Sequence, residues 1–196
     1  MYFDRIKRLL TDPAKFFKDA SKEKGYWEVL RFFVVVYVFA TIIQLIVSIP
    51  LNKNLFGSQL FAYLLSSLVV SIIYAFIGPF IASVIAHLGI LILVRGKSFF
   101  STFKAITYGM IVIVGYGVLA SIIASIMYLA SPNSINLPGF IVNLITIIGV
   151  VHMLIVEAVG VSRHHSITKG KAFFGIILVP LIILIIFIAM GGSLLV

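Results

Sequence analysis

Three ionisable side chains lie inside long apolar stretches of this sequence: His87, His152 and Glu157. Placing such groups in hydrocarbon is costly, so an ionisable residue within a membrane-spanning segment is a functional hypothesis by default. With Asn143 they form a candidate intramembrane polar site, and the chemistry they suggest is a proton or cation relay. The alternative, which we favour, is a structural pair satisfied inside a helix bundle, because three groups make no continuous path across a membrane.

The spacing of these residues limits which of them can act together. Counted inward from the neighbouring basic loops, His87 and Glu157 both lie about two helical turns or less from the same membrane edge. They can pair if their two helices are neighbours. His152 lies nearer the midplane and about 140° around the helix from Glu157, so we do not expect one partner to serve both.

Metal-binding and catalytic motifs are not found in the sequence. The histidines match no zinc spacing, the adjacent pair His164-His165 in a loop points two ways, and there is no cysteine. The sequence contains no paired-carboxylate motif, HExxH, nucleophile elbow or phosphate-binding loop. A single intramembrane carboxylate also lacks the second group that acid–base hydrolysis needs. We therefore expect no metal, no cofactor and no enzymatic activity.

The elements that carry these groups have the composition of a membrane protein. Of 196 residues, 62% are hydrophobic and 11% are charged, and the mean hydropathy is +1.22. So few charges cannot form the exterior of a soluble protein. A crossing helix needs about 20 apolar residues. We predict an all-α polytopic membrane protein, a five-transmembrane-helix bundle, with spans at about 32–50, 59–94, 103–130, 139–161 and 172–195.

Basic residues indicate which loops share a side of the membrane. Fourteen of the fifteen Lys and Arg residues fall in an N-terminal cluster or in loops near 95–104 and 163–171, and Lys53 stands alone. Basic loops stay on the cytoplasmic side. Five crossings put all three clusters there, whereas splitting 59–94 into two crossings does not. The sequence thus predicts a cell-membrane protein with a cytoplasmic N-terminus and an external C-terminus.

The run 59–94 is longer than one crossing requires, at about 54 Å. We expect residues from about 59 to 69 to extend past the hydrocarbon or to lie in its outer interface. We expect a kink at Pro79, because proline removes a backbone hydrogen bond and clashes with the preceding turn. Outer reversals are predicted at 51–58 and 131–138, which are rich in Asn, Ser, Pro and Gly.

Residues 1–30 are predicted to be a cytoplasmic amphipathic segment that precedes a transmembrane domain of residues 31–196. Apolar residues recur at helical spacing before Thr11, and Thr11-Asp12-Pro13 has the pattern of a helix restart, with Thr11 or Asp12 as the N-cap and Pro13 near the first helical position. We expect two short helices lying on the inner leaflet, with a disordered charged tail as the alternative.

The net charge of +9 suggests anionic lipid headgroups as a partner, at about 1 kcal/mol per basic residue near the surface. We expect no nucleic-acid binding, because no recognition motif accompanies the charge. A protein partner or a homo-oligomer remains an alternative. The candidate lipid- or partner-binding cytoplasmic face comprises Arg5, Arg8, Lys15, Trp27, Arg31, Arg95, Lys97, Lys104, Arg163, Lys169 and Lys171.

Small residues recur at four-residue spacing in two of the predicted spans. Small side chains let helix backbones approach closely in lipid. We expect these stripes to pack inside the bundle, with a dimer face as the alternative. The candidate packing positions are Ser71, Ala75, Ser83, Gly117 and Ser121.

Short motifs follow one another in a particular order along nearly the whole chain. They are Asp12-Pro13 with Phe16-Phe17 and Gly25, then His87 through Arg95-Gly96 and Ser98-Phe99 to Thr102-Phe103-Lys104-Ala105 and Tyr108-Gly109, and last Val150 to Val161 with His165-Ser166, Lys171-Ala172 and Pro180. In order and spacing they resemble the Yip1 family of small multi-pass membrane proteins. The resemblance implies a five-helix membrane domain with a cytoplasmic N-terminus.

Eukaryotic members of that family are associated with Rab GTPases and with traffic between endoplasmic reticulum and Golgi. This chain lacks their long polar N-terminal region, so Rab binding is not carried over, and it looks more like a prokaryotic, even archaeal, member. We expect a non-enzymatic membrane protein of Yip1 type with a membrane-organising, trafficking-like or partner-binding role through its cytoplasmic face. The alternative is a small transporter or channel component using His87, His152 and Glu157.

Overall fold

The computed structural model describes residues 2–95, 97–131 and 136–193, and these contain helices and no strand. The predicted kind of element is therefore confirmed for the described residues. In chain order the elements are α1 (Tyr2–Thr11), α2 (Pro13–Ala20), α3 (Tyr26–Val47), α4 (Ile49–Phe56), a 3-10 turn (Gly57–Gln59), α5 (Leu60–Leu93), α6 (Phe99–Ala130), α7 (Asn136–His165) and α8 (Lys169–Ser193).

Five helices among the described residues are long and apolar enough to cross a membrane. They are Tyr26–Val47, Gly57–Leu93, Phe99–Ala130, Gly139–His165 and Lys169–Ile188. Their number and order agree with the five predicted spans. The chain is an all-α polytopic membrane protein, and a single candidate span, Gly57–Leu93, covers most of the predicted run 59–94.

Some boundaries differ from those that hydropathy predicts. Helix α3 begins at Tyr26 rather than 32, α6 begins at Phe99 rather than 103, and α7 ends at His165 rather than 161. His164 and His165 therefore lie in the last turn of α7, not in a loop. These helix ends carry polar residues that a hydropathy window leaves out, and they are held by contacts with other elements.

The predicted reversal at 51–58 is a helix followed by a 3-10 turn. Pro50 lies in the first turn of α4, where its missing N–H is not needed. The helix stops at Gly57, whose φ of +50° is readily adopted by glycine. Gly96, residues 132–135 of the other predicted reversal and residues 194–195 of the last predicted span lie outside the described residues.

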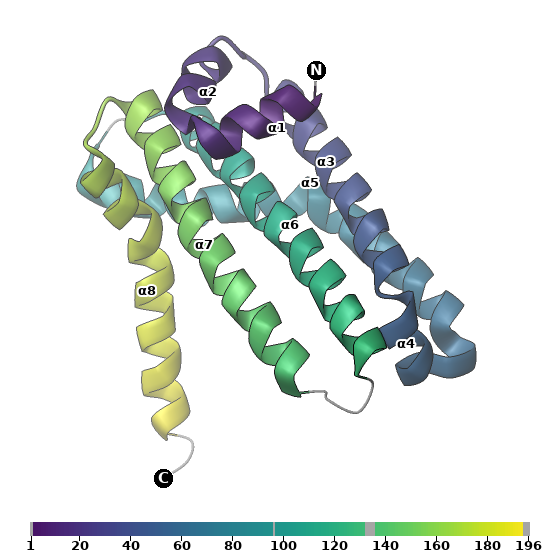
Figure 1. Cartoon of the computed structure of the whole chain (residues 1–196). Helices are drawn as coiled ribbons and strands as arrows, with labels where there is room; N and C mark the ends of the chain where they lie inside the picture. Colours follow the sequence, from purple (N-terminus) through teal and green to yellow (C-terminus); the bar gives the residue numbers. More distant parts are fainter. Residues whose placement is uncertain (1, 96, 132–135, 194–196) are drawn as a thin grey trace.

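Helix α6 lies among α3, α5 and α7, and α8 packs on α5 and α7 (Figure 1). Helices α1 and α2 cross one end of this bundle, near the turn between α7 and α8 (Figure 1). We call α1, α2 and the connection through residues 21–25 the cap, and we call the end that carries it the basic end. Because elements surround α6 there, every residue from Thr102 to Val112 is buried.

The two predicted N-terminal helices are present, but they pack on protein rather than lying only on lipid. Asp12 caps α2 by accepting a hydrogen bond from the Lys15 N–H at 3.1 Å, and Pro13 occupies the first turn. The inner side chains Leu9, Phe16 and Phe17 are fully or almost fully buried. The apolar stripe of the segment is therefore part of the core of the protein.

Helix α5 changes direction along its length: its first part runs beside α3, and its later part crosses behind α6 and α7 toward α8 (Figure 1). Pro79 lies inside this helix and is buried. Helices α5 and α8 pack closely at Gly89, where an added Cβ would lie 2.0 Å from the Gly175 carbonyl oxygen. This glycine contact was not among the predicted packing positions.

The predicted packing positions lie in different surroundings. Ala75 and Ser83 are fully buried and Ser71 is half-buried. An added Cβ on Gly117 would meet the side-chain nitrogen of Gln44 in α3 at 2.7 Å, and the Ser121 hydroxyl donates to the Gly117 carbonyl oxygen. Packing inside the bundle, with a dimer face as the alternative, stays a prediction.

Candidate functional site

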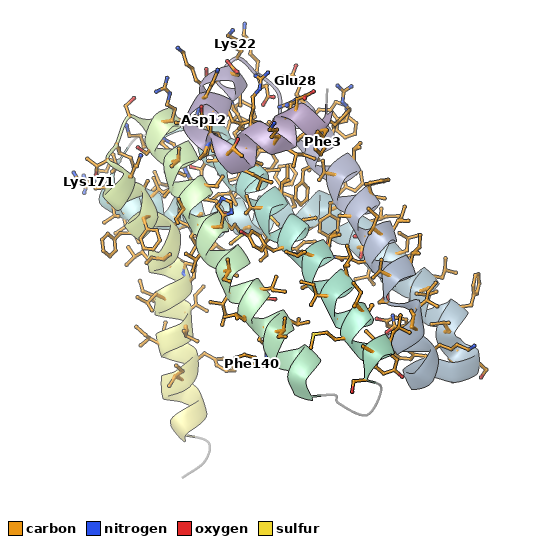
Figure 2. The ribbon with its side chains drawn as sticks, viewed as in Figure 1. Phe3, Asp12, Lys22, Glu28, Phe140 and Lys171 are labelled. Carbon is orange, nitrogen blue, oxygen red and sulfur yellow. The ribbon has the colours of Figure 1, made fainter. Side chains whose placement is uncertain are left out.

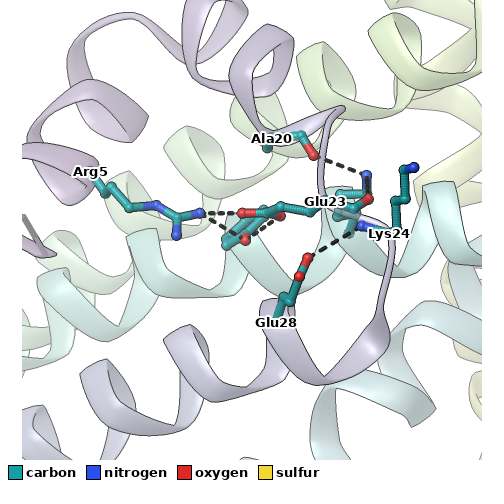
Figure 3. Close-up of polar contacts among 7 residues, drawn as sticks. Arg5, Ala20, Glu23, Lys24 and Glu28 are labelled. Atoms are coloured by element: carbon teal, nitrogen blue, oxygen red, sulfur yellow. Dashed lines mark hydrogen bonds and ion pairs between the residues drawn. The ribbon is translucent and has the colours of Figure 1, made fainter.

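A polar cluster at the basic end joins the cap to α6, and Glu23 lies at its centre (Figure 3). The Arg5 guanidinium donates to the Glu23 carboxylate at 2.5 Å, and the Tyr108 hydroxyl donates to the other carboxylate oxygen at 2.6 Å. Arg5 also donates to the Tyr108 oxygen at 3.0 Å. Three residues far apart in sequence thus share one closed set of charge-assisted hydrogen bonds.

Lys104 fastens the other side of the same connection. Its ammonium donates to the Ala20 carbonyl oxygen at 3.0 Å and to the Glu23 carbonyl oxygen at 2.9 Å (Figure 3). Ala20 is the last residue of α2, where helix carbonyls lack partners within the helix and carry the negative end of the dipole. Lys104 is only 3% exposed, so it neutralises a helix end instead of facing headgroups, which differs from the sequence prediction.

Arg5 is likewise engaged inside the protein. Partial burial alone would lower the pKa of its guanidinium, but the Tyr108 and Glu23 oxygens outweigh burial and raise the pKa above its ordinary value. The guanidinium carbon also lies 4.4 Å from the centre of the Phe32 ring. Arg5 therefore remains a cation that holds α1 to α6 and α3.

Aromatic packing seats α2 on α7. Gly160 makes room for the Phe17 ring, because an added Cβ would come within 2.6 Å of it. Phe16 packs edge-on against Tyr108, with ring centres 4.9 Å apart. His164 meets Phe17 edge-on as well, and its buried Nε2 has no hydrogen-bond partner among the described residues.

A second cluster joins the ends of α5, α6 and α7. The Thr102 hydroxyl lies 2.8 Å from His87 Nδ1 and 2.9 Å from His165 Nε2, and its single proton can serve one of the two contacts. Lys97, in the turn before α6, donates to the His165 carbonyl oxygen at 2.7 Å. His87 is therefore satisfied by Thr102 rather than by Glu157, since α5 packs mainly on α3, α6 and α8.

The other predicted intramembrane residues lie in separate places. His152 approaches the Tyr116 hydroxyl at 3.3 Å, on the side of α7 where Leu10 also lies. Glu157 is 3% exposed and lies against Gly109 of α6. Asn143 is exposed on the half of α7 that lies away from the basic end. These groups form no continuous hydrogen-bonded path among the described residues.

Most of the predicted basic face does point away from the bundle. Lys22 and Lys171 extend outward at the basic end, whereas Phe140 lies toward the opposite end (Figure 2). Lys97 is half-buried, and Arg8 makes a long contact of 3.4 Å with Asp19. The exposed members of the predicted face are Arg8, Lys15, Trp27, Arg31, Arg95, Arg163, Lys169 and Lys171.

The family model of the Yip1 domain matches residues 7–190, nearly the whole chain. The chain belongs to the Yip1 family. Comparison with curated proteins and with solved structures gives no match. The Yip1 family is one of membrane proteins and is not known for enzymatic activity. The match confirms the resemblance, but it does not bear out the expected prokaryotic origin.

Residues from the separate motifs that resemble the Yip1 family contact one another in the structure. Phe16 and Phe17 contact Tyr108 and His164, while Thr102 bridges His87 and His165. Sequence reasoning missed Glu23. A signal for it was available, because Lys104 and Tyr108 lie four residues apart on one helix face and Glu23 is a carboxylate in a basic segment.

Proposed function

We propose that this Yip1-family protein is a non-enzymatic membrane-organising protein whose basic end faces the cytoplasm and binds anionic lipid headgroups of that leaflet. The observation that carries the proposal is how the basic residues are divided. Arg5 and Lys104 are engaged inside the protein, whereas Lys15, Lys18 and Lys22 extend outward from a cap that those contacts hold in place.

Exposed apolar side chains suited to a membrane interface lie in the cap and in the first turn of α3 beside it. Phe3 is 77% exposed and Trp27 is 62% exposed, and both lie close in sequence to basic residues. Amphipathic helices with aromatic residues on one face and cations on the other lie in the headgroup zone. This combination of aromatic and basic side chains supports binding of the cap to the membrane leaflet at the basic end of the bundle.

The proposed orientation can be tested with single cysteines, because the natural chain has none. Lys22→Cys lies in the cap, and Lys53→Cys is its matched control in α4 at the opposite end; both lysines are exposed. In intact cells, a membrane-impermeant maleimide should label Lys53→Cys, and it should label Lys22→Cys only after permeabilisation. The reverse pattern would overturn the orientation.

Lipid preference can be measured through Trp27, the single tryptophan of the chain. In reconstituted bilayers, energy transfer from Trp27 to a dansyl-labelled anionic lipid should exceed transfer to a dansyl-labelled zwitterionic lipid at equal mole fraction. The excess should shrink with added salt, because exposed charges are screened. Equal transfer to the two lipids at low salt would contradict the proposal.

A charge variant sharpens the same measurement. Replacing Lys15, Lys18 and Lys22 together with Gln should remove most of the anionic excess, at about 1 kcal/mol for each lysine at the surface. Lys53→Gln should leave the excess unchanged, because that residue lies at the opposite end. His87, His152 and Glu157 lie in separate environments and share no site, so they do not support the transporter alternative.

A further inference from the structure

A cavity of about 530 Å³ lies among α5, α6, α7 and α8, within the membrane-spanning part of the chain. Its walls are almost entirely apolar, with Ala82 and Ala86 from α5, Met110 from α6, and Ile176 from α8 among them. The volume is within the range of small-molecule sites, which are typically about 300–1,000 Å³ and mostly apolar. The cavity is thus large enough for a compact organic ligand.

One carboxyl group lines this apolar cavity. Glu157 is 3% exposed, and its side chain lies on Gly109, where an added Cβ would meet its Cγ at 2.1 Å. No described residue donates a hydrogen bond to the Glu157 carboxyl or forms an ion pair with it. A buried carboxyl with no partner is held neutral by a proton, whereas a positive charge beside it stabilises the ionised form. A cation in the cavity would therefore supply the partner that the Glu157 carboxylate lacks.

We propose that this cavity binds a lipophilic organic monocation that enters from the bilayer. The positive charge lies beside Glu157, and the apolar body of the ligand occupies the space between α5 and α8. Charge complementarity selects a cation, and the apolar walls select one whose charge is carried on a hydrophobic body. Tyr74 and Pro180 line the cavity and are exposed on the outer surface of the bundle, so the entrance faces hydrocarbon.

Other occupants fit these observations less well. An anion would meet an acidic group with no cation beside it. A metal ion needs several ligands, and the described residues contain no group of three or more His, Cys, Asp or Glu side chains that could hold one. The inference does not depend on the proposed function, because none of the residues that line the cavity belongs to the cap.

The test compares two ions of nearly the same size and shape but opposite charge. The purified full-length protein is reconstituted in zwitterionic nanodiscs, and equilibrium dialysis measures binding of tetraphenylphosphonium and of tetraphenylborate, with empty nanodiscs subtracted. The wild type should bind the phosphonium saturably, near one per chain, and should show no saturable binding of the borate. Equal binding of both ions, or no saturable cation binding, overturns the proposal.

Two variants locate the binding site. Glu157→Gln keeps the size of the side chain and should weaken phosphonium binding at least about tenfold, which is 1.4 kcal/mol. Ala82→Phe should weaken it by filling the cavity while leaving the carboxyl in place. His152→Gln is the matched control in the same helix and should bind like the wild type, because His152 contacts Tyr116 outside this cavity.

Each result decides the matter. Wild-type affinity in Glu157→Gln or in Ala82→Phe overturns the proposal, as does an equal loss in His152→Gln. If Glu157→Gln does not give monodisperse protein, the cation preference of the wild type and the affinity of Ala82→Phe decide alone. Loss of cation binding in Ala82→Phe with retained binding in His152→Gln then supports the site.

Discussion

The basic end of the bundle and the opposite end are stabilised in different ways. At the basic end, every residue of α6 from Thr102 to Val112 is buried, and polar side chains bond across three or more elements. At the opposite end, every residue of α8 from Leu181 to Ile188 is exposed on the surface of the chain. Apolar side chains can face lipid without penalty, whereas polar groups must find partners inside the protein. The difference predicts that substitutions act strongly at one end and weakly at the other.

The largest effect is expected at the contact between α5 and α8. In Gly89→Ala the new Cβ would lie 2.0 Å from the Gly175 carbonyl oxygen, so the two backbones must move apart. The free energy of unfolding should fall by about 3 kcal/mol or more. Thermal unfolding in one detergent measures this change. Gly170→Ala, where nothing lies within 4 Å of the added Cβ, should change little. Equal unfolding temperatures for the two variants would contradict close packing here.

The next largest effect is expected at Lys104. Lys104→Met keeps much of the side-chain volume but leaves the Ala20 and Glu23 carbonyl oxygens without their donor. The free energy of unfolding should fall by about 1–3 kcal/mol, because the two acceptors lose their donor. The cap should also be held less tightly to α6. Trypsin should then cleave within α2 faster than in the wild type. Lys171→Met, an exposed position at the same end, should leave that rate unchanged. An unchanged rate in Lys104→Met would remove the anchoring role.

A smaller effect is expected at Tyr108. Tyr108→Phe keeps the ring against Phe16 but removes the hydroxyl that forms hydrogen bonds with Glu23 and Arg5. The free energy of unfolding should fall by about 1 kcal/mol. Hydrogen exchange followed by mass spectrometry should show faster exchange in α1 and α2. Tyr63→Phe, in the α5 segment at the opposite end, should leave exchange in the cap unchanged. Slower or unaltered exchange in Tyr108→Phe would count against the hydroxyl's role.

The smallest effect is expected in the half of α8 that lies away from the basic end. Ile183 is 53% exposed, so Ile183→Ala should change the free energy of unfolding by less than about 0.5 kcal/mol in detergent. Ile176→Ala, seven residues earlier and 5% exposed, should be clearly more destabilising, because it loses packing against α5. If the two variants lost similar free energies of unfolding, the two parts of α8 would contribute equally to stability, contrary to this prediction.

The spans could be predicted from the sequence because a membrane crossing depends on local properties. The length and hydropathy of each run, with the distribution of charge between runs, favoured one long crossing at 59–94 over two short ones. Asp12-Pro13 predicted the start of α2 for a similar reason, since an N-cap depends on residues within one turn. The helix ends at Tyr26 and His165 were missed, because their stability comes from contacts with distant elements.

The candidate site was predictable in its residue types but not in its partners. Lys104 has the same local sequence whether it faces headgroups or caps α2, and its partner Ala20 is 84 positions away. His87 and Glu157 lie at similar predicted depths in the membrane. In the packed structure, however, His87 lies at hydrogen-bonding distance from Thr102, whereas Glu157 lines a cavity. The sequence around Gly89 does not show that the Gly175 backbone of α8 lies against it.

The sequence by itself determined a five-span helical protein with concentrated basic charge, because these features follow from composition along the chain. Only the tertiary structure decided which charges are neutralised internally and which remain on the surface. It also decided that the Glu157 carboxyl, in one of the candidate spans, has no hydrogen-bond or ion-pair partner within the described part of the chain. The reason is physical: hydrogen bonds and ion pairs require atoms within about 3–4 Å, and for distant residues that proximity comes from packing.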